Sequence, residues 1–399
     1  MKVITFLFCL FACQLQAQTT TVLISIDGFA AHYLEEFKPK NMLALADKGI
    51  VTSGLIPSFP TKTFANHLTL VTGKVPFEHG IVLNKFYDKK TDDVYSYGNS
   101  KKPNQWLKYP PIWTILEQKN IPTAIYFWPE SDKSYQGIRP TYYRNYDGKV
   151  PNSRRFKKML EWLNIQDKSK PQLIVGYFST IDSAGHQYGR DSKELKLAIE
   201  EFDQLLGDFV GTISTQVNSP VNIILVSDHG MVKIDKKKAL LKSNIIPQWM
   251  NSTFKIIMND SQIFIYNLSK DQKLIDQAYN ELESNHIAQA NQYDLFKKGN
   301  YPAYWKVTES LSFVPDIILS AIPPATFTNN LDKISAETHG FETKYTSDLD
   351  GIFIAAGPDF KEKTQIKSFS NTEVFKVLSR LFSLDQESAD DSIVNNILK

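Results

Sequence analysis

Short apolar runs alternate with stretches of helical periodicity over roughly the first 230 residues of the chain. The apolar runs, which we interpret as strands, are Thr21–Ile26, Thr123–Phe127, Leu173–Thr180 and Val221–Ser227. The helical stretches are Asn41–Lys48, Phe64–Thr72, Ile112–Lys119, Arg154–Leu163 and Lys193–Ser214. This alternation predicts an α/β fold with a mostly parallel central sheet and helices on both faces.

The pattern changes after about Asp235, where shorter apolar runs predict a small α+β insert covering about residues 236–335. Its predicted elements are the strands Phe254–Met258 and Gln262–Tyr266 and the helix Lys270–Glu283. We expect the main pattern to return with the strands Asp316–Ser320 and Gly351–Ala355 and to end with a helix over Asn371–Leu381. Residues 19–399 are therefore expected to form a single domain that carries this insert.

The first 18 residues have the features of a secretory leader. A short basic start precedes an apolar core from Val3 to Ala12, which is shorter than the about 20 residues that span a bilayer. Leu10-Phe-Ala-Cys13 also resembles a lipobox, so a lipid anchor at Cys13 is an alternative. Cys9 is the one other cysteine, so the mature chain cannot form an internal disulfide. We expect a secreted protein of a bacterial periplasm or cell surface.

The overall charge gives little reason to expect a nucleic-acid partner. The 399-residue chain has 45 Lys and Arg against 43 Asp and Glu, which leaves a net charge of +2. Binding to a nucleic-acid duplex depends on many basic contacts with phosphate groups. A small-molecule partner is the better expectation.

Three predicted strands end at a carboxylate, and this is the most informative feature of the chain. Asp27, Asp182 and Asp228 follow them, with His229 directly after the third and His186 four residues after the second. Ligands of open α/β sheets bind in the crevice outside the carboxyl ends of the strands. A single Asp at such a position is often only a helix cap or turn residue, and a single His is often structural. The convergence of several such residues favours a shared site.

Carboxylate and imidazole groups are ligands suited to a divalent ion such as zinc. His339, in a glycine-containing loop before Gly351–Ala355, brings the number of candidate ligands to six. Six ligands fit two ions with three protein ligands each, and a nucleophile or water would complete each shell. The sequence therefore predicts a two-metal hydrolase.

The candidate nucleophile is Thr63, at the start of the helix Phe64–Thr72. A hydroxyl there faces unpaired N–H groups and the positive end of the helix dipole, and both favour its alkoxide. The alternative is that Thr63 only caps the helix. Thr61 and Ser58 are competing hydroxyls that spacing does not exclude.

Several motifs in order along the chain resemble the nucleotide pyrophosphatase/phosphodiesterase family of the alkaline phosphatase superfamily. They are Asp27-Gly28, Pro60–His67 with Thr72-Gly73, His79–Ile81, Phe127–Asp132, Asp182–Gly189, Ser227–Met231 and His339-Gly340. The resemblance covers nearly the whole chain after the leader, and it implies an alkaline phosphatase-like catalytic domain. Ala65 and Glu130 depart from it, since the family usually has proline and glycine there.

The resemblance also implies roles for individual residues. It implies two zinc ions, one bound by Asp182, His186 and His339, the other by Asp27, Asp228, His229 and the nucleophile Thr63. It further implies that Asn84 donates a hydrogen bond to a phosphoryl oxygen. Phe64 and Tyr143, or Tyr142 in place of the latter, would stack on a nucleobase.

The predicted activity is hydrolysis of nucleotide phosphodiester or pyrophosphate bonds through a threonyl-phosphate intermediate. Diesters are favoured because no motif near Thr63 supplies the arginine that usually neutralises the extra charge of a monoester. The alternatives are a phosphodiesterase for choline headgroups, a phosphomonoesterase, and a non-catalytic zinc-binding surface protein. A sulfatase is disfavoured, because Thr63 is neither Cys nor Ser and cannot be oxidised to formylglycine.

Overall fold

A computed structural model describes residues 19–97, 105–269, 271–384 and 391–399 of the chain. The leader at residues 1–18, including Cys9 and the lipid-anchor candidate Cys13, lies outside the described residues. Among the residues described, no helix combines the length and the apolar character needed to cross a membrane.

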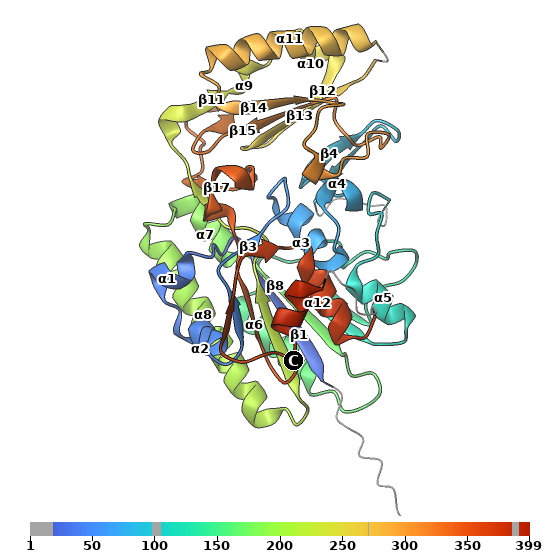
Figure 1. Cartoon of the computed structure of the whole chain (residues 1–399), viewed down its shortest axis with the longest axis vertical. Helices are drawn as coiled ribbons and strands as arrows, with labels where there is room; N and C mark the ends of the chain where they lie inside the picture. Colours follow the sequence, from blue (N-terminus) through green and yellow to red (C-terminus); the bar gives the residue numbers. More distant parts are fainter. Residues whose placement is uncertain (1–18, 98–104, 270, 385–390) are drawn as a thin grey trace, which may run out of the picture.

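An eight-stranded sheet forms the centre of the molecule (Figure 1). Neighbouring strands are parallel, except that β18 is antiparallel to β2 and to β9. The strand order is β19 (Thr364–Ile366), β2 (Ile50–Thr52), β18 (Phe353–Ala356), β9 (Val221–Val226), β1 (Thr20–Ile26), β8 (Leu173–Phe178), β6 (Thr123–Tyr126) and β7 (Tyr142–Arg144). The predicted α/β class, with a mostly parallel sheet, is confirmed.

Helices cover both faces of this sheet, because its central strands are apolar on both sides. In β1, Val22, Ile24 and Ile26 face one core while Leu23 faces the other. The first core is covered by α2 (Lys40–Ala46), α6 (Asn152–Leu163) and α8 (Lys193–Gln216). The second is covered by α3 (Thr63–Thr72), α5 (Ile112–Gln118) and α12 (Glu373–Leu381).

The insert forms a separate four-stranded antiparallel sheet at one end of the molecule (Figure 1). Its strand order is β12 (Phe254–Met258), β13 (Gln262–Asn267), β15 (Ile317–Ala321) and β14 (Tyr293–Lys297). Helix α11 (Gln272–Ala288) covers the outer face, and the inner face packs on the main core through Phe264 and Ile318.

The strand predicted at Asp316–Ser320 therefore does not belong to the main sheet. It is β15, which pairs with β13 and β14 inside the insert. Its apolar run is typical of a central parallel strand because both of its faces are buried, Ile318 against the main core and Ile317 and Leu319 under α11. The apolar pattern indicates that both faces of the strand are buried, but it does not indicate to which sheet the strand belongs.

Short elements complete the described parts of the chain. Strand β10 (Val232–Lys233) pairs with β17 (Glu337–Thr338), and this pairing fixes the loop that follows β17. The others are α1 (Tyr33–Phe37), β3 (Leu55–Ile56), α4 (Pro76–His79), β4 (Lys85–Asp88), β5 (Asp93–Ser96), α7 (Thr180–Tyr188), β11 (Ala239–Leu241), α9 (Lys242–Ile245), α10 (Met250–Thr253), β16 (Thr326–Thr328), β20 (Phe369–Ser370) and α13 (Ser392–Ile397).

Candidate active site

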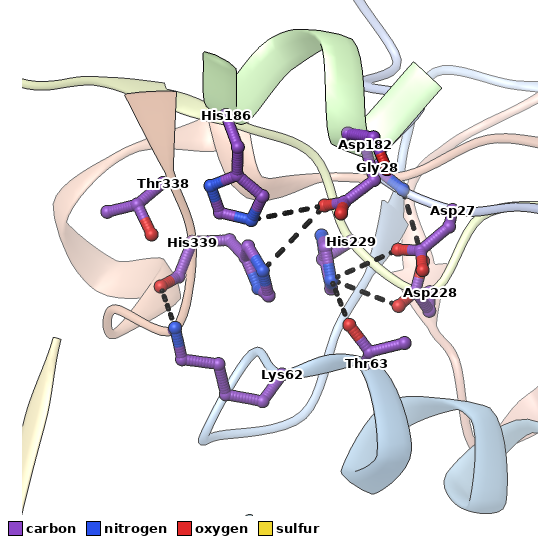
Figure 2. A network of polar contacts seen from close by, with 12 residues as sticks. Asp27, Gly28, Lys62, Thr63, Asp182, His186, Asp228, His229, Thr338 and His339 are labelled. Atoms are coloured by element: carbon purple, nitrogen blue, oxygen red, sulfur yellow. Dashed lines mark hydrogen bonds and ion pairs between the residues drawn. The ribbon is translucent and has the colours of Figure 1, made fainter. Parts of the chain in front are cut away.

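The six predicted metal ligands lie together at the carboxyl edge of three neighbouring parallel strands, β9, β1 and β8 (Figure 2). Asp27 follows β1, and Asp228 and His229 follow β9. Asp182 and His186 lie one turn apart on α7, so both face the same side, and His339 follows β17. Segments that are far apart in the chain thus meet where the topology places ligand sites.

The ligand atoms form two adjoining groups. His229 Nε2 lies 3.0 Å from Asp228 Oδ2 and 3.5 Å from Asp27 Oδ1. Asp182 Oδ1 lies 3.4 Å from His186 Nε2 and 3.8 Å from His339 Nε2. The rings of His229 and His339 stack with centroids 3.5 Å apart, so His229 borders both groups.

Backbone carbonyls orient all three imidazoles. His186 Nδ1 lies 2.9 Å from the carbonyl of Glu337, His229 Nδ1 2.9 Å from that of Gly230, and His339 Nδ1 2.7 Å from that of Thr61. A carbonyl only accepts, so each Nδ1 carries the proton and donates. Each Nε2 lone pair is then directed toward the carboxylates, which is the usual arrangement of metal-binding histidines.

The carboxylates in this cluster leave acceptor atoms without donors. Asp27 Oδ1, Asp182 Oδ1 and Asp228 Oδ2 are buried and accept no hydrogen bond from any described residue. Buried polar atoms are otherwise almost always paired, so these three need another partner. Bare carboxylate oxygens beside imidazole nitrogens are the donor set of a divalent cation such as zinc.

The charges of the cluster point to the same conclusion. Burial, followed by the nearby carboxylates of Asp228 and Asp182, raises the pKa of Asp27 well above its ordinary value. Burial lowers the pKa of His339 well below its ordinary value, which keeps that ring neutral. Burial also disfavours a charged His229, but Asp228 outweighs it and raises the pKa of His229 overall. A bound cation would relieve the carboxylate repulsion, and it would compete for His229 with the proton whose binding Asp228 favours.

Two supporting residues were not assigned a role from the sequence. The Tyr177 hydroxyl donates to Asp27 Oδ2 over 2.5 Å. His67 lies one turn after Thr63 on α3, with Nδ1 2.8 Å from the Thr63 carbonyl and 3.3 Å from Asp228 Oδ2. Its spacing of four from Thr63 places both on one face of the helix, and that spacing was the available sequence signal.

Among the three candidate hydroxyls, only Thr63 faces the cluster. Thr63 begins α3, and its Oγ1 lies 3.4 Å from His229 Nε2. Thr61 Oγ1 donates to the Phe341 carbonyl and accepts from the Gly340 amide. Ser58 Oγ donates to Asn371 Oδ1. The two competing hydroxyls are thus engaged elsewhere.

Thr63 also opens onto a cavity of about 240 Å³ that includes the candidate metal ligands Asp27 and Asp182 in its lining. Phe64 and Asn84 line it beside Thr63, and Asn84 Oδ1 accepts the Phe64 N–H over 3.0 Å. The Asn84 NH2 group therefore remains as a donor at the cavity. The aromatic lining comprises Phe64, Tyr97, Phe127, Trp128, Tyr146 and Tyr177, and the charged lining comprises Asp27, Glu130, Asp132, Lys133, Arg144 and Asp182.

The structure places Tyr143 outside this cavity lining. Its hydroxyl accepts from Arg139 over 2.8 Å, while the alternative Tyr142 packs near Trp162 and donates to Ser169. Tyr146, three residues later, lines the cavity instead, with its ring 5.3 Å from that of Phe127. The prediction of Tyr143 needs this correction because the short edge strand β7 ends at Arg144, and the chain then turns back toward the site.

The departure at Glu130 has a visible consequence. Glu130 has a φ of +65°, a left-handed conformation that glycine adopts without strain. Its buried carboxylate accepts from the Tyr95 hydroxyl over 2.8 Å and from Lys133 Nζ over 2.6 Å. These contacts hold a side chain in the cavity wall where the resembling family usually has none. Ala65, the other departure, is buried inside α3.

Comparison with known proteins identifies the fold. The structure resembles human ectonucleotide pyrophosphatase/phosphodiesterase 5 with a TM-score of 0.85 and 24% identity, covering 95% of this chain and all of that one. A murine counterpart, described as inactive through a Thr-to-Ala substitution and in complex with AMP, gives a TM-score of 0.84. The fold is therefore the alkaline phosphatase-like α/β fold of these proteins.

Sequence comparison identifies relatives. An uncharacterized pyrophosphatase/phosphodiesterase of Schizosaccharomyces pombe is 30% identical over 386 residues, which are 92% of this chain and 77% of that protein. A venom phosphodiesterase of Crotalus durissus collilineatus is also 30% identical, and the chain spans 47% of its length. Family member 1 of the ectonucleotide pyrophosphatase/phosphodiesterases of Mus musculus is 29% identical, and the chain spans 42% of it.

The family model for type I phosphodiesterase/nucleotide pyrophosphatase matches residues 21–342. That range contains each of the six candidate metal ligands and Thr63. The chain therefore belongs to the type I phosphodiesterase/nucleotide pyrophosphatase family, whose enzymes hydrolyse phosphodiester bonds.

Proposed function

We propose that this protein is a two-zinc nucleotide phosphodiesterase/pyrophosphatase that works through a phosphorylated Thr63. One observation carries the proposal: three buried carboxylate oxygens without hydrogen-bond donors converge with three imidazole Nε2 atoms beside the Thr63 hydroxyl. The proposed ligands are Asp182, His186 and His339 for one ion and Asp27, Asp228 and His229 for the other.

The chain's own groups account for most of the reaction. Bound zinc would lower the pKa of the Thr63 hydroxyl and stabilise charge on the phosphoryl group. The Thr63 hydroxyl loses its proton to solvent and Oγ1 attacks phosphorus; the bond to the leaving oxygen breaks, the leaving group departs with that electron pair and takes up a proton from solvent, and the phosphoryl group remains esterified to Thr63 as a threonyl phosphate. The Asn84 NH2 group donates to a phosphoryl oxygen, and the N-terminus of α3 favours the developing negative charge. Water then hydrolyses the threonyl phosphate and frees Thr63.

A diester is the better substrate because Lys62, next to Thr63 in the sequence, and Lys133, in the cavity lining, are each already paired with a carboxylate. Lys62, the neighbour of Thr63, donates instead to Asp260 over 2.7 Å and to the His339 carbonyl over 2.8 Å. Arg144 is exposed and donates to the Tyr143 carbonyl. A monoesterase usually binds its additional charge with arginine or a pair of basic residues.

The aromatic lining of the cavity supports a nucleotide as the substrate. We propose that Phe64 and Tyr146, which both line it, stack on the base. Base stacking on an aromatic side chain contributes about 1–3 kcal/mol. The AMP bound to the murine relative and the nucleotide pyrophosphatase names of other relatives support this choice.

Two measurements test the proposal. Rates on a nitrophenyl nucleotide diester, nitrophenyl phosphate and nitrophenyl phosphocholine should rank the nucleotide diester first; a dominant monoester or phosphocholine rate would reject the substrate class. Thr63→Ala should lose nearly all turnover yet bind zinc, whereas Thr63→Ser should keep measurable turnover. Substantial turnover by Thr63→Ala would reject the nucleophile.

We also propose export directed by residues 1–18, with release after Ala17 or Gln18 or lipid attachment at Cys13. Mass spectrometry of the mature protein from its native host distinguishes the routes. An unprocessed N-terminus in the isolated protein would reject both.

A further inference from the structure

A turn of the insert reaches the catalytic loops and contacts them directly. The turn joins β12 to β13 and contains Asp260 and Ser261. Lys62 Nζ donates to Asp260 Oδ1 over 2.7 Å and to the His339 carbonyl over 2.8 Å. Figure 2 shows Lys62 extended toward this carbonyl, away from Thr63. Ser261 Oγ donates to the same carbonyl over 2.7 Å. Lys62, which precedes the proposed nucleophile, and the loop that contains His339 are therefore both bonded to the same turn of the insert.

Further contacts make the turn rigid and fit it to the His339 loop. The Asn259 side-chain oxygen accepts the amides of Ser261 over 2.9 Å and Gln262 over 2.8 Å, which fixes the turn. Asp260 Oδ2 accepts the hydroxyl of Thr338, and Gln262 Nε2 donates to the Gly340 carbonyl. Residues on both sides of His339 are thus bonded to the insert.

Gly340 shows how closely these parts approach. A Cβ at this position would lie 2.0 Å from Ser261 Oγ and 2.5 Å from Lys62 Cε, and the φ of Gly340 is +112°. A side chain would therefore displace both the insert turn and Lys62. Gly340 therefore allows the insert turn and the His339 loop to approach each other this closely.

The two catalytic loops are also joined to each other. The His339 Nδ1 donates to the Thr61 carbonyl over 2.7 Å, and the Gly340 amide donates to Thr61 Oγ1 over 2.8 Å. Thr61 and Lys62 precede the nucleophile directly. A displacement of Lys62 would consequently be transmitted in two directions, to Thr63 at the start of α3 and to His339 in the metal cluster.

We propose that Lys62 and Asp260 are a positioning pair through which the insert sets the Thr63 hydroxyl relative to the His339 side of the metal cluster. The inference rests on the proposed function of Thr63. Neither residue lines the cavity, and Lys62, with 6% of its side chain exposed, is buried between the insert and the loops. The alternative is that the pair only tethers the insert to the main domain.

A matched control separates these roles. Lys89 follows β4 in the main domain and donates to both carboxylate oxygens of Asp316 in the insert, each over 3.0 Å. This second lysine–aspartate pair also tethers the insert, but it lies outside the catalytic loops. Lys62→Met and Asp260→Asn should therefore be compared with Lys89→Met, which removes this second lysine–aspartate tether. Asp260→Asn keeps the side-chain shape and serves if Lys62→Met does not fold.

The expected result is a fall in kcat of about 10- to 100-fold for Lys62→Met, since a shift near 1 Å at the reacting groups costs about that much. KM should change little, because the cavity is untouched. Zinc affinity measured by chelator competition should also fall, and Lys62→Arg should restore part of both losses. The double variant of Lys62 and Asp260 should lose less than the two single losses combined, because both changes remove one interaction.

The proposal is overturned if kcat and zinc affinity of the Lys62 and Asp260 variants match those of Lys89→Met at equal thermal stability. It is equally overturned if KM rises with kcat unchanged. Chelator competition needs no substrate, so it tests the pair even if the wild-type protein shows no diesterase activity. A lack of diesterase activity in the wild-type protein would reject the proposed function. The comparison of zinc affinities would then decide the role of the Lys62–Asp260 pair.

Discussion

The hydrogen bond from Tyr177 to Asp27 gives the sharpest test of the metal site. The substitution is Tyr177→Phe, which removes one hydroxyl from a side chain that is almost fully buried. The Tyr177 hydroxyl lies 2.5 Å from Asp27 Oδ2, and Asp27 Oδ1 has no donor among the described residues. The variant therefore leaves the proposed ligand without a side-chain donor while its shape is preserved.

The magnitude follows from the charge on the acceptor. A hydrogen bond to a charged group contributes about 1.5–3 kcal/mol, and about 1.4 kcal/mol corresponds to a factor of ten. Zinc affinity should therefore fall about 10- to 100-fold, the range expected when a partner of a metal ligand is lost. The assay is chelator competition on purified protein, followed by the zinc dependence of diesterase activity. Tyr95→Phe is the control, since Tyr95 is also buried and donates to a carboxylate, that of Glu130.

The loss of zinc affinity in Tyr177→Phe should depend on pH. Burial and the neighbouring carboxylates raise the pKa of Asp27, and the Tyr177 hydrogen bond lowers it. Removing that bond raises the pKa further, so protons compete more strongly with zinc as pH falls. The zinc affinities of Tyr177→Phe and wild type should diverge toward acidic pH and approach each other toward alkaline pH. Equal affinities across the pH range, or an equal loss in Tyr95→Phe, would refute the assignment of Asp27 as a ligand.

Three further predictions concern the metal, a glycine and a buried acid. Chelation should abolish diesterase activity and added zinc should restore it; activity that survives complete chelation contradicts the two-metal proposal. Gly28→Ala should weaken zinc binding, because its Cβ would lie 2.9 Å from the Asp182 backbone at a φ of +69°, whereas Gly211→Ala, in open space on α8, should raise the melting temperature slightly. Burial raises the pKa of Glu342 to about 7. The stability that protonated Glu342 contributes is therefore complete below the pKa of this residue in the unfolded chain, and it is lost as pH rises through about 7. Denaturant titration of Glu342→Gln should show a weaker loss of stability over that window, and an unchanged pH profile would contradict the assignment.

The convergence of the candidate metal ligands could be predicted because two sequence signals agree there. The ends of strands can be predicted from the ends of apolar runs, and parallel strands bring their carboxyl ends to one edge of the sheet. Asp27, Asp182 and Asp228 were therefore expected at one edge of the sheet, and the neighbouring positions of β9, β1 and β8 in the structure bring them close together. Asp182 and His186 are four residues apart, so a helix beginning near Asp182 was enough to predict that both side chains lie on one face.

Other features depend on tertiary packing that periodicity does not encode. The apolar run of β15 is compatible with either sheet, and only its antiparallel pairing with β13 assigns it to the insert. The choice of Tyr146 over Tyr143 depends on where the chain turns after β7, beyond the range in which alternation can be read. Glu130 was noticed as a departure, but its left-handed backbone and its contact with Lys133 required coordinates.

Lys62 shows why such packing decides function. In sequence it adjoins Thr63, and a lysine at that place could equally well neutralise a substrate phosphate. Its partner Asp260 is 198 residues away in a different structural unit, so no local pattern could assign its direction. Because the ammonium group is already paired with Asp260 and the His339 carbonyl, moving it to a phosphate would leave the partly buried Asp260 carboxylate without its cation, which is unfavourable. The same contact that we propose positions Thr63 thus also disfavours a doubly charged monoester at this site.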